Sequence, residues 1–101
     1  MPVNPSDEAP IRSVRLHILG QVQGVWFRAW TVQEARARGL RGWVRNRLDG
    51  SVEALVIGPP DQVRDMMAAC HEGPPMARVE AVEEHPAEDD GSVAFRQRPT
   101  A

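Results

Sequence analysis

Two short stretches of the chain, Gly20–Arg28 and Gly42–Asn46, carry the side chains best suited to chemistry. The first contains two glycines and ends in an arginine. Glycine lets a backbone curl so that several N–H groups face inward, and such a nest binds anions. The arginine adds a planar fork of donors that matches phosphate or carboxylate. The second stretch ends in an asparagine, so the two together indicate an anion cradle with an oriented amide, which is a hydrolytic arrangement.

Each of these features also has a purely structural explanation. The spacing of Gly20 and Gly24 is common in turns, and it is neither a Walker A loop nor a dinucleotide fingerprint. Asn46 has a residue type that is frequent in turns, where its amide would do no chemistry. Arg28 is harder to explain, because it falls where a helix is expected to begin and the first helical turn prefers acids. A bound anion would account for it, and Asn46 would then orient a water molecule.

The elements around these stretches are predicted by periodicity and by turn residues. Val14–Leu19 alternates as a strand does. Phe27–Arg38 contains no proline or glycine and is followed by a glycine, which favours a helix. Two further strands are predicted at Gly42–Asn46 and Val52–Ile57, and the Asp49-Gly50 turn between them indicates a hairpin.

The second half of the chain continues the alternation of helix and strand. A second helix is predicted where apolar residues recur at helical spacing, namely at Val63, Met66, Met67 and Cys70. It ends at the glycine and prolines of residues 73–75. A fourth strand is predicted at Arg78–Glu84, and a short fifth strand at Val93–Gln97.

This order of elements predicts an α+β fold, the ferredoxin-like split βαβ arrangement: β-α-β-β-α-β plus a short terminal strand, with two helices on one face of a mostly antiparallel sheet. In that topology the first and second strands run parallel with the third between them. Their ends therefore lie at the same edge of the sheet. The loop with Arg28 follows the first strand and Asn46 lies near the end of the second, so the topology brings the two side chains together.

Composition restricts the class of protein further. At 101 residues the chain forms one domain, which we place at residues 11–99 after a polar, proline-containing flexible tail at residues 1–10. The net charge of −2 argues against a nucleic-acid partner. All 12 basic residues are arginines and there is no tyrosine. Lysine-based phosphate loops, Schiff bases and phenolic acids or bases are thereby excluded.

Cysteine and histidine usage excludes two other kinds of site. The single cysteine, Cys70, forms no internal disulfide, which favours a reducing compartment. His17, His71 and His85 have no ligand spacing, so we expect no metal site. The sequence shows no leader and no apolar run of membrane-spanning length. We therefore expect a cytoplasmic protein without a membrane partner, and a monomer because the domain is small.

The two stretches, extended to Gly20–Arg28 and Gly42–Gly50, resemble the two signatures of the acylphosphatase family, and the resemblance runs from about Val14 to Arg98. It implies the fold predicted above, with no metal or cofactor. It also implies an enzyme that hydrolyses the carboxyl–phosphate anhydride of a small acyl phosphate to a carboxylate and inorganic phosphate.

The resemblance assigns roles to individual residues. Arg28 would bind the phosphate and Asn46 would position the water. Thr31 matches a threonine of the family near the arginine. The rest of the phosphate cradle would be the backbone N–H groups of Gln21, Val22, Gln23, Gly24, Val25, Trp26 and Phe27.

Two alternatives remain open at this point. A ferredoxin-like fold also serves non-enzymatic modules that bind an anion or a protein, and such a module would use the cradle for binding alone. An acylphosphatase-like unit would also fit inside a larger carbamoyl-transfer machine. The sequence does not select among acetyl, benzoyl and carbamoyl phosphate or an aspartyl phosphate on a protein, since all present the same reactive group.

Overall fold

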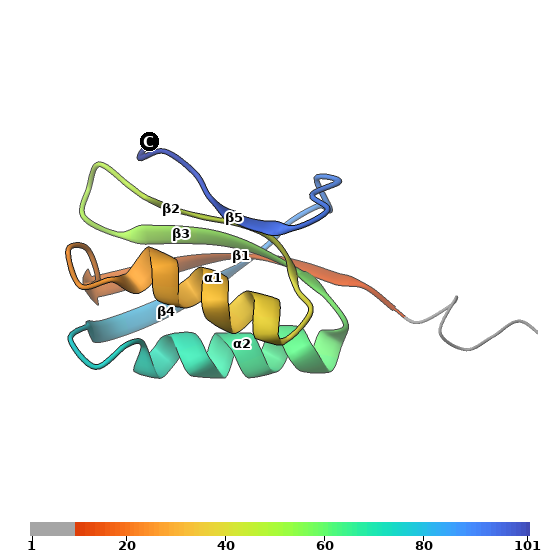
Figure 1. Ribbon diagram of the computed structural model, residues 1–101, viewed down its shortest axis with the longest axis horizontal. Coiled ribbons are helices and arrows are strands. Elements are labelled where there is room, and N and C mark those ends of the chain that lie inside the picture. The colour runs from red at the N-terminus through yellow and green to blue at the C-terminus, as the bar shows by residue number, and fades with distance from the viewer. Residues whose placement is uncertain (1–9) are drawn as a thin grey trace, which may run out of the picture.

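The structure, a computed structural model, describes residues 10–101 of the chain. Helices and strands follow one another in the predicted order (Figure 1). Their bounds are β1 (Arg12–Gln21), α1 (Phe27–Ala37), β2 (Arg41–Asn46), β3 (Val52–Gly58), α2 (Pro60–Glu72), β4 (Arg78–Pro86) and β5 (Phe95–Gln97). The flexible tail predicted for residues 1–10 lies outside the described residues except for Pro10, which is exposed.

The strands form one sheet in the order β4-β1-β3-β2-β5. Neighbouring strands are antiparallel except β2 and β5, which are parallel. Both helices lie on one face of the sheet (Figure 1). The predicted α+β ferredoxin-like arrangement, with two helices on one face of a mostly antiparallel sheet and a short terminal strand, is therefore confirmed.

The hydrophobic core lies between the helices and the sheet. In β1 the alternating residues Val14, Leu16 and Ile18 are buried, and β3, the central strand, is buried along its whole length. The apolar face of α2 packs into the same core through Val63, Met66 and Cys70. Burial raises the pKa of the Cys70 thiol to about 12, so this group stays protonated and unreactive at neutral pH.

Two glycines let neighbouring strands approach too closely for a side chain. A Cβ atom added to Gly20 would lie 2.1 Å from the carbonyl oxygen of Arg78 in β4. One added to Gly42 would lie 1.8 Å from the carbonyl oxygen of Leu55 in β3. The sheet itself thus requires the glycine that opens each of the two stretches singled out in the sequence.

The two helices begin differently. α2 has a proline at its first position and Asp61 in its first turn, which suits the partial positive charge of a helix N-terminus. α1 has no acidic residue in its first turn, and no side chain caps it. Neither helix within residues 10–101 is long and apolar enough to cross a membrane.

The last strand is shorter than the sequence predicts. β5 begins at Phe95, where its pairing with Gly42 of β2 starts, instead of at Val93; Val93 is 87% exposed, whereas Phe95 is buried. Beyond β5 the chain continues beside β2, where the N–H group of Arg98 donates to the carbonyl oxygen of Val44 and that of Ala101 donates to the carbonyl oxygen of Asn46. The final residues therefore run along the strand that ends at Asn46.

Candidate active site

A pocket of about 230 Å³ lies where β1 and β2 end at the same edge of the sheet. It brings together Arg28, the second residue of α1, and Asn46, the last residue of β2. Antiparallel pairing of β3 with both β1 and β2 makes those two strands parallel, as the topology predicted. The residues that line the pocket are Val22, Gly24, Trp26, Phe27, Arg28, Ala29, Asn46 and Gln97.

The loop between β1 and α1 is attached to the core by its apolar side chains. Val22 and Phe27 are buried, and Val25 packs against the core cluster. Gly24 and Trp26 have positive φ angles of 72° and 68°, so left-handed residues alternate with others along the loop. Such alternation turns successive N–H groups toward one side and forms an anion-binding nest. For Trp26, which is not glycine, this conformation costs about 1–2 kcal/mol.

The N–H groups of this loop are not used by the fold. Within residues 10–101, no hydrogen bond has a backbone N–H group between Val22 and Trp26 as its donor. The loop leads directly into the N-terminus of α1, which has partial positive charge and no acidic side chain to balance it. Free donors and positive charge therefore coincide at the pocket, which suits an anion.

Arg28 and Asn46 are equally unengaged. Both are partly buried, and neither side chain makes a hydrogen bond or an ion pair with any of residues 10–101. Their unpaired polar atoms are not sealed inside the protein, since the described residues contain no buried side-chain nitrogen or oxygen without a partner. The guanidinium group and the amide are thus both available to a ligand in the pocket.

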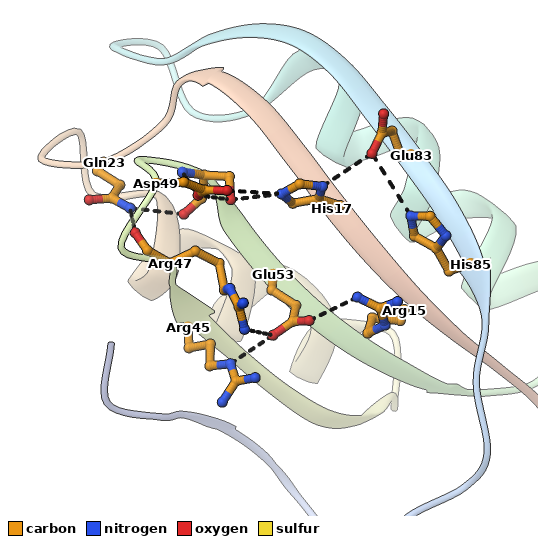
Figure 2. Close-up of polar contacts among 10 residues, drawn as sticks. Arg15, His17, Gln23, Arg45, Arg47, Asp49, Glu53, Glu83 and His85 are labelled. Carbon is orange, nitrogen blue, oxygen red and sulfur yellow. Dashed lines mark hydrogen bonds and ion pairs between the residues drawn. The ribbon is translucent and has the colours of Figure 1, made fainter. Parts of the chain in front are cut away.

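A side-chain amide connects the loop to the strand that carries Asn46. Gln23 Nε2 donates to the carbonyl oxygen of Arg47 at 2.7 Å and to that of Ser51 at 2.8 Å. Figure 2 shows Gln23 reaching across to the hairpin between β2 and β3. Both hydrogens of one amide thereby hold the loop against the hairpin. This contact sets the spacing between the free N–H groups and Asn46.

The residues on either side of Asn46 point to the opposite face of the sheet, as strand alternation requires. There the buried carboxylate of Glu53 accepts from Arg45 Nε at 2.7 Å and from Arg15 Nη1 at 3.0 Å, and Arg47 Nη1 lies 3.4 Å from it (Figure 2). Burial alone would raise the pKa of Glu53, but the hydrogen bonds from Arg45 and Arg15 outweigh it and hold this pKa below its ordinary value. Arg45 and Arg47 are therefore partners of a buried carboxylate and not simply solvated side chains.

The turn of the hairpin is fixed on the same face. Asp49 accepts from the backbone N–H of Ser51 at 2.9 Å and from its hydroxyl at 2.6 Å, and these bonds lower the pKa of Asp49. One ring nitrogen of His17 lies 3.1 Å from the Glu83 carboxylate (Figure 2). The other lies 2.8 Å from the Ser51 hydroxyl. These contacts give Asp49 the structural role that its Asp-Gly turn predicted.

Comparison with known proteins bears on this site directly. The acylphosphatase family model matches residues 14–97. The chain belongs to the acylphosphatase family. An acylphosphatase of Rhizorhabdus wittichii is 51% identical over 86 residues, which are 85% of this chain and 87% of that protein. One of Rhodospirillum rubrum is 47% identical over 89% of this chain and 99% of that protein.

Solved acylphosphatases share the fold as well. The structure of the enzyme from Coxiella burnetii is 32% identical, superposes with a TM-score of 0.85, and is matched over 90% of this chain and 96% of its own. That from Bacillus subtilis is 33% identical with a TM-score of 0.83, over 88% and 99% of the two chains. The resemblance drawn from the two signatures is confirmed, and with it the enzyme class, an acylphosphatase.

The side chains of the residues predicted from the sequence differ in whether they line this pocket. Val22, Gly24, Trp26, Phe27, Arg28 and Asn46 line it. Gln21 instead ends β1 paired with Arg78 of β4, and its side chain is exposed. The side chains of Gln23 and Val25 are directed to the hairpin and the core. Thr31 is fully buried, and its hydroxyl donates to the carbonyl oxygen of Phe27 at 2.8 Å.

Gln97 and Ala29 also line the pocket and were not predicted from the sequence. Gln97 arrives through β5, whose parallel pairing sets it opposite Val44 of β2. Nothing in the sequence near Gln97 signals this, because the pairing partner of a three-residue strand is decided by distant residues. Ala29 follows Arg28 in the first turn of α1, so the position of the helix alone would have found it.

Proposed function

We propose that residues 11–99 form an acylphosphatase domain in which Arg28 and the loop N–H groups bind the phosphoryl group and Asn46 orients the attacking water. The substrate is a small acyl phosphate, and the products are a carboxylate and inorganic phosphate. The observation that carries this proposal is the meeting of Arg28 and Asn46 in one pocket, with no side-chain partner for either among residues 10–101.

Phosphate binding in this proposal uses donors that are in place before the substrate arrives. The backbone N–H groups from Val22 to Phe27 supply neutral donors, and Arg28 supplies charged ones, which form shorter and stronger bonds. Gln21 is left out of this cradle because its backbone belongs to the β1–β4 ladder. Thr31 is a positioning residue, since its hydroxyl holds the carbonyl oxygen of Phe27. Donors fixed beforehand stabilise the charge that develops in the transition state without reorganising.

The reaction needs little acid–base assistance. The oxygen of a water molecule held by Asn46 forms a bond to phosphorus, while the bond from phosphorus to the acyl oxygen breaks and its electron pair leaves with the carboxylate. A carboxylate is a weakly basic leaving group and needs no proton from the enzyme. The proton lost by the water passes to an oxygen of the phosphate itself. Arg28 and Asn46 therefore act through position and charge, with no covalent intermediate.

We also propose that the chain works as a monomer in the cytoplasm. The pocket is built from the β1–α1 loop, β2 and β5 of one chain, so a second copy adds nothing to it. The single cysteine, Cys70, is buried and makes no disulfide, as suits a reducing compartment. Sedimentation velocity of the purified protein tests the monomer, and a dimer at micromolar concentration would contradict it.

The test of the proposed reaction is hydrolysis of benzoyl phosphate in water enriched in oxygen-18, in the presence of a metal chelator. We expect one labelled oxygen in the inorganic phosphate, none in the benzoate, and no burst of product. The matched control is Arg64→Ala, which removes an exposed arginine of α2 and should leave the rate unchanged. Label in the benzoate would show attack at the carbonyl carbon, and would exclude the role given to Asn46.

A further inference from the structure

Trp26 is the one exposed side chain among the tryptophans and phenylalanines of residues 10–101. The chain has three tryptophans and two phenylalanines, all within the described residues. Phe27 and Phe95 are buried, and Trp30 and Trp43 are partly so. Trp26 is 58% exposed and lines the pocket that contains Arg28 and Asn46. Single exposed apolar side chains are common on protein surfaces, and what distinguishes Trp26 is its place in the wall of the pocket that contains Arg28 and Asn46.

The fold does not explain why position 26 carries a large, exposed side chain. The left-handed backbone of Trp26 belongs to the nest, and glycine would adopt it without strain. The indole is not a member of the core cluster, and it makes no capping hydrogen bond although Trp26 occupies the cap position of α1. The nest therefore accounts for the backbone at this position, whereas neither packing nor capping accounts for the large side chain.

The other pocket walls offer little apolar surface to a ligand. Val22 and Phe27 are 1% and 2% exposed, so their side chains belong to the core. Gly24 has no side chain, Ala29 has a methyl group, and Gln97 is polar. A substrate whose phosphoryl group lies in the cradle has only its acyl group left to recognise. Among the residues that line the pocket, only Trp26 offers a large apolar surface that would cover the acyl group.

We propose that Trp26 is a specificity-determining residue whose indole covers the acyl group and favours flat, apolar acyl phosphates over acetyl phosphate. This inference rests on the proposed function, since the phosphoryl group must first be held by Arg28 and the loop N–H groups. An aromatic acyl group packs on the indole face or against its edge, as aromatic pairs do. An acetyl group is too small to bury a comparable area.

The test compares kcat/KM for benzoyl and acetyl phosphate in the wild type, Trp26→Ala, Trp26→Gly and Trp26→Phe. We expect Trp26→Ala and Trp26→Gly to lower the value for benzoyl phosphate about two- to tenfold, through KM, and to change the value for acetyl phosphate less than twofold. Trp26→Phe should keep most of the preference. Trp26→Gly also relieves the backbone, so agreement between the two truncations assigns the effect to the lost ring.

Inorganic phosphate as an inhibitor separates this inference from the proposed function. Its inhibition constant should change much less than kcat/KM for benzoyl phosphate in Trp26→Ala and Trp26→Phe, because both variants keep Arg28 and every backbone N–H group of the cradle. A benzoyl-to-acetyl ratio unchanged in Trp26→Ala, with activity still dependent on Arg28, overturns the role of Trp26 alone. Activity that survives Arg28→Ala overturns the proposed function instead. Trp43→Phe, which alters a tryptophan stacked on Arg45 and Arg98 away from the pocket, is the matched control and should leave the ratio unchanged.

Discussion

The two faces of the sheet at the β2–β3 hairpin treat their polar side chains in opposite ways. On the open face, Arg45 and Arg47 contact the buried carboxylate of Glu53. On the helix side, Asn46 lies between them in sequence and has no side-chain partner within residues 10–101. β2 therefore supplies both Arg45, a member of a satisfied ion cluster, and Asn46, an amide without a side-chain partner within residues 10–101. The difference follows from strand alternation, which sends successive residues to opposite faces.

Arg28 extends the contrast to a second element. An arginine in the first turn of a helix is repelled by the helix dipole, and α1 has no acid there to offset it. On the open face, by contrast, Arg15, Arg45 and Arg47 are paired with the carboxylate of Glu53. An unpaired arginine in an unfavourable place, beside free N–H groups, is thus better explained by a ligand than by the fold. Variants on the two faces should separate these roles.

The largest expected effect comes from Arg28→Ala. Charge-assisted hydrogen bonds are worth about 1.5–3 kcal/mol each, so losing two lowers kcat/KM by roughly 10²–10⁴-fold. The melting temperature should not fall, because the side chain has no partner in the described residues and opposes the helix dipole. Phosphate release and thermal unfolding of the same preparation measure both. A large fall in the melting temperature would show that Arg28 stabilises the fold, as the arginines around Glu53 do, and would contradict the contrast between them.

Asn46→Ala should have the next largest effect. A side chain that orients the attacking water acts in the transition state, so we expect kcat to fall about a hundredfold with KM nearly unchanged. Steady-state kinetics with benzoyl phosphate give both constants. Should KM rise while kcat survives, Asn46 binds the substrate and does not position the water.

On the open face, Glu53→Gln should lower the stability of the fold and leave the activity nearly unchanged. The isosteric amide keeps the volume but loses charge-assisted bonds to Arg15 and Arg45. Because these arginines are partly exposed, we expect a loss on the order of 2 kcal/mol in the free energy of unfolding, or about 10 °C in melting temperature. Activity at 25 °C should stay within about twofold. Glu88→Gln, an exposed carboxylate on the β4–β5 connection, is the control for charge alone.

The pH dependence of the stability lost in Glu53→Gln tests whether the charge of Glu53 causes that loss. Because the folded pKa of Glu53 lies below its ordinary value of 4.5, its contribution is fully present above that pH. It is lost as the pH falls through the folded pKa, since the unfolded chain takes up the proton first. The difference in melting temperature between wild type and Glu53→Gln should therefore narrow below about pH 4.5. A constant difference down to pH 3 would assign the effect to packing.

Most of the fold could be predicted because its signals are local. Alternation along β1, the Asp49-Gly50 turn and the proline and glycine residues around α2 each act over a few positions. The start of β5 could not be predicted, because Val93 and Phe95 look alike in sequence and only the sheet decides which is buried. Tertiary contact overrides propensity there.

The residues of the site also divide into those with local signals in the sequence and those placed by distant contacts. Arg28 and Asn46 were found because residue type, helix position and topology pointed to them. The contacts of Gln23 with Arg47 and Ser51 span 24 and 28 residues, and no spacing rule reaches so far. The pairing of Arg45 with Glu53 was missed although both residues are near in sequence, because it requires the register of β2 on β3.

The smallest expected effect therefore tests a contact that sequence did not show. Gln23 holds the cradle against the hairpin, so Gln23→Ala should lower kcat about tenfold, as two neutral hydrogen bonds of about 1 kcal/mol each allow. The inhibition constant of inorganic phosphate should change much less, because the cradle survives and only its spacing from Asn46 is loosened. Gln23→Glu keeps the shape but cannot donate to two carbonyl oxygens, so it should be no better than alanine. Gln33→Ala, an exposed glutamine of α1, should have no effect. If kcat of Gln23→Glu instead equals that of the wild type, the length of the side chain matters and its two N–H hydrogens do not. The hydrogen bonds from Gln23 to Arg47 and Ser51 would then not set the position of Asn46 relative to the cradle.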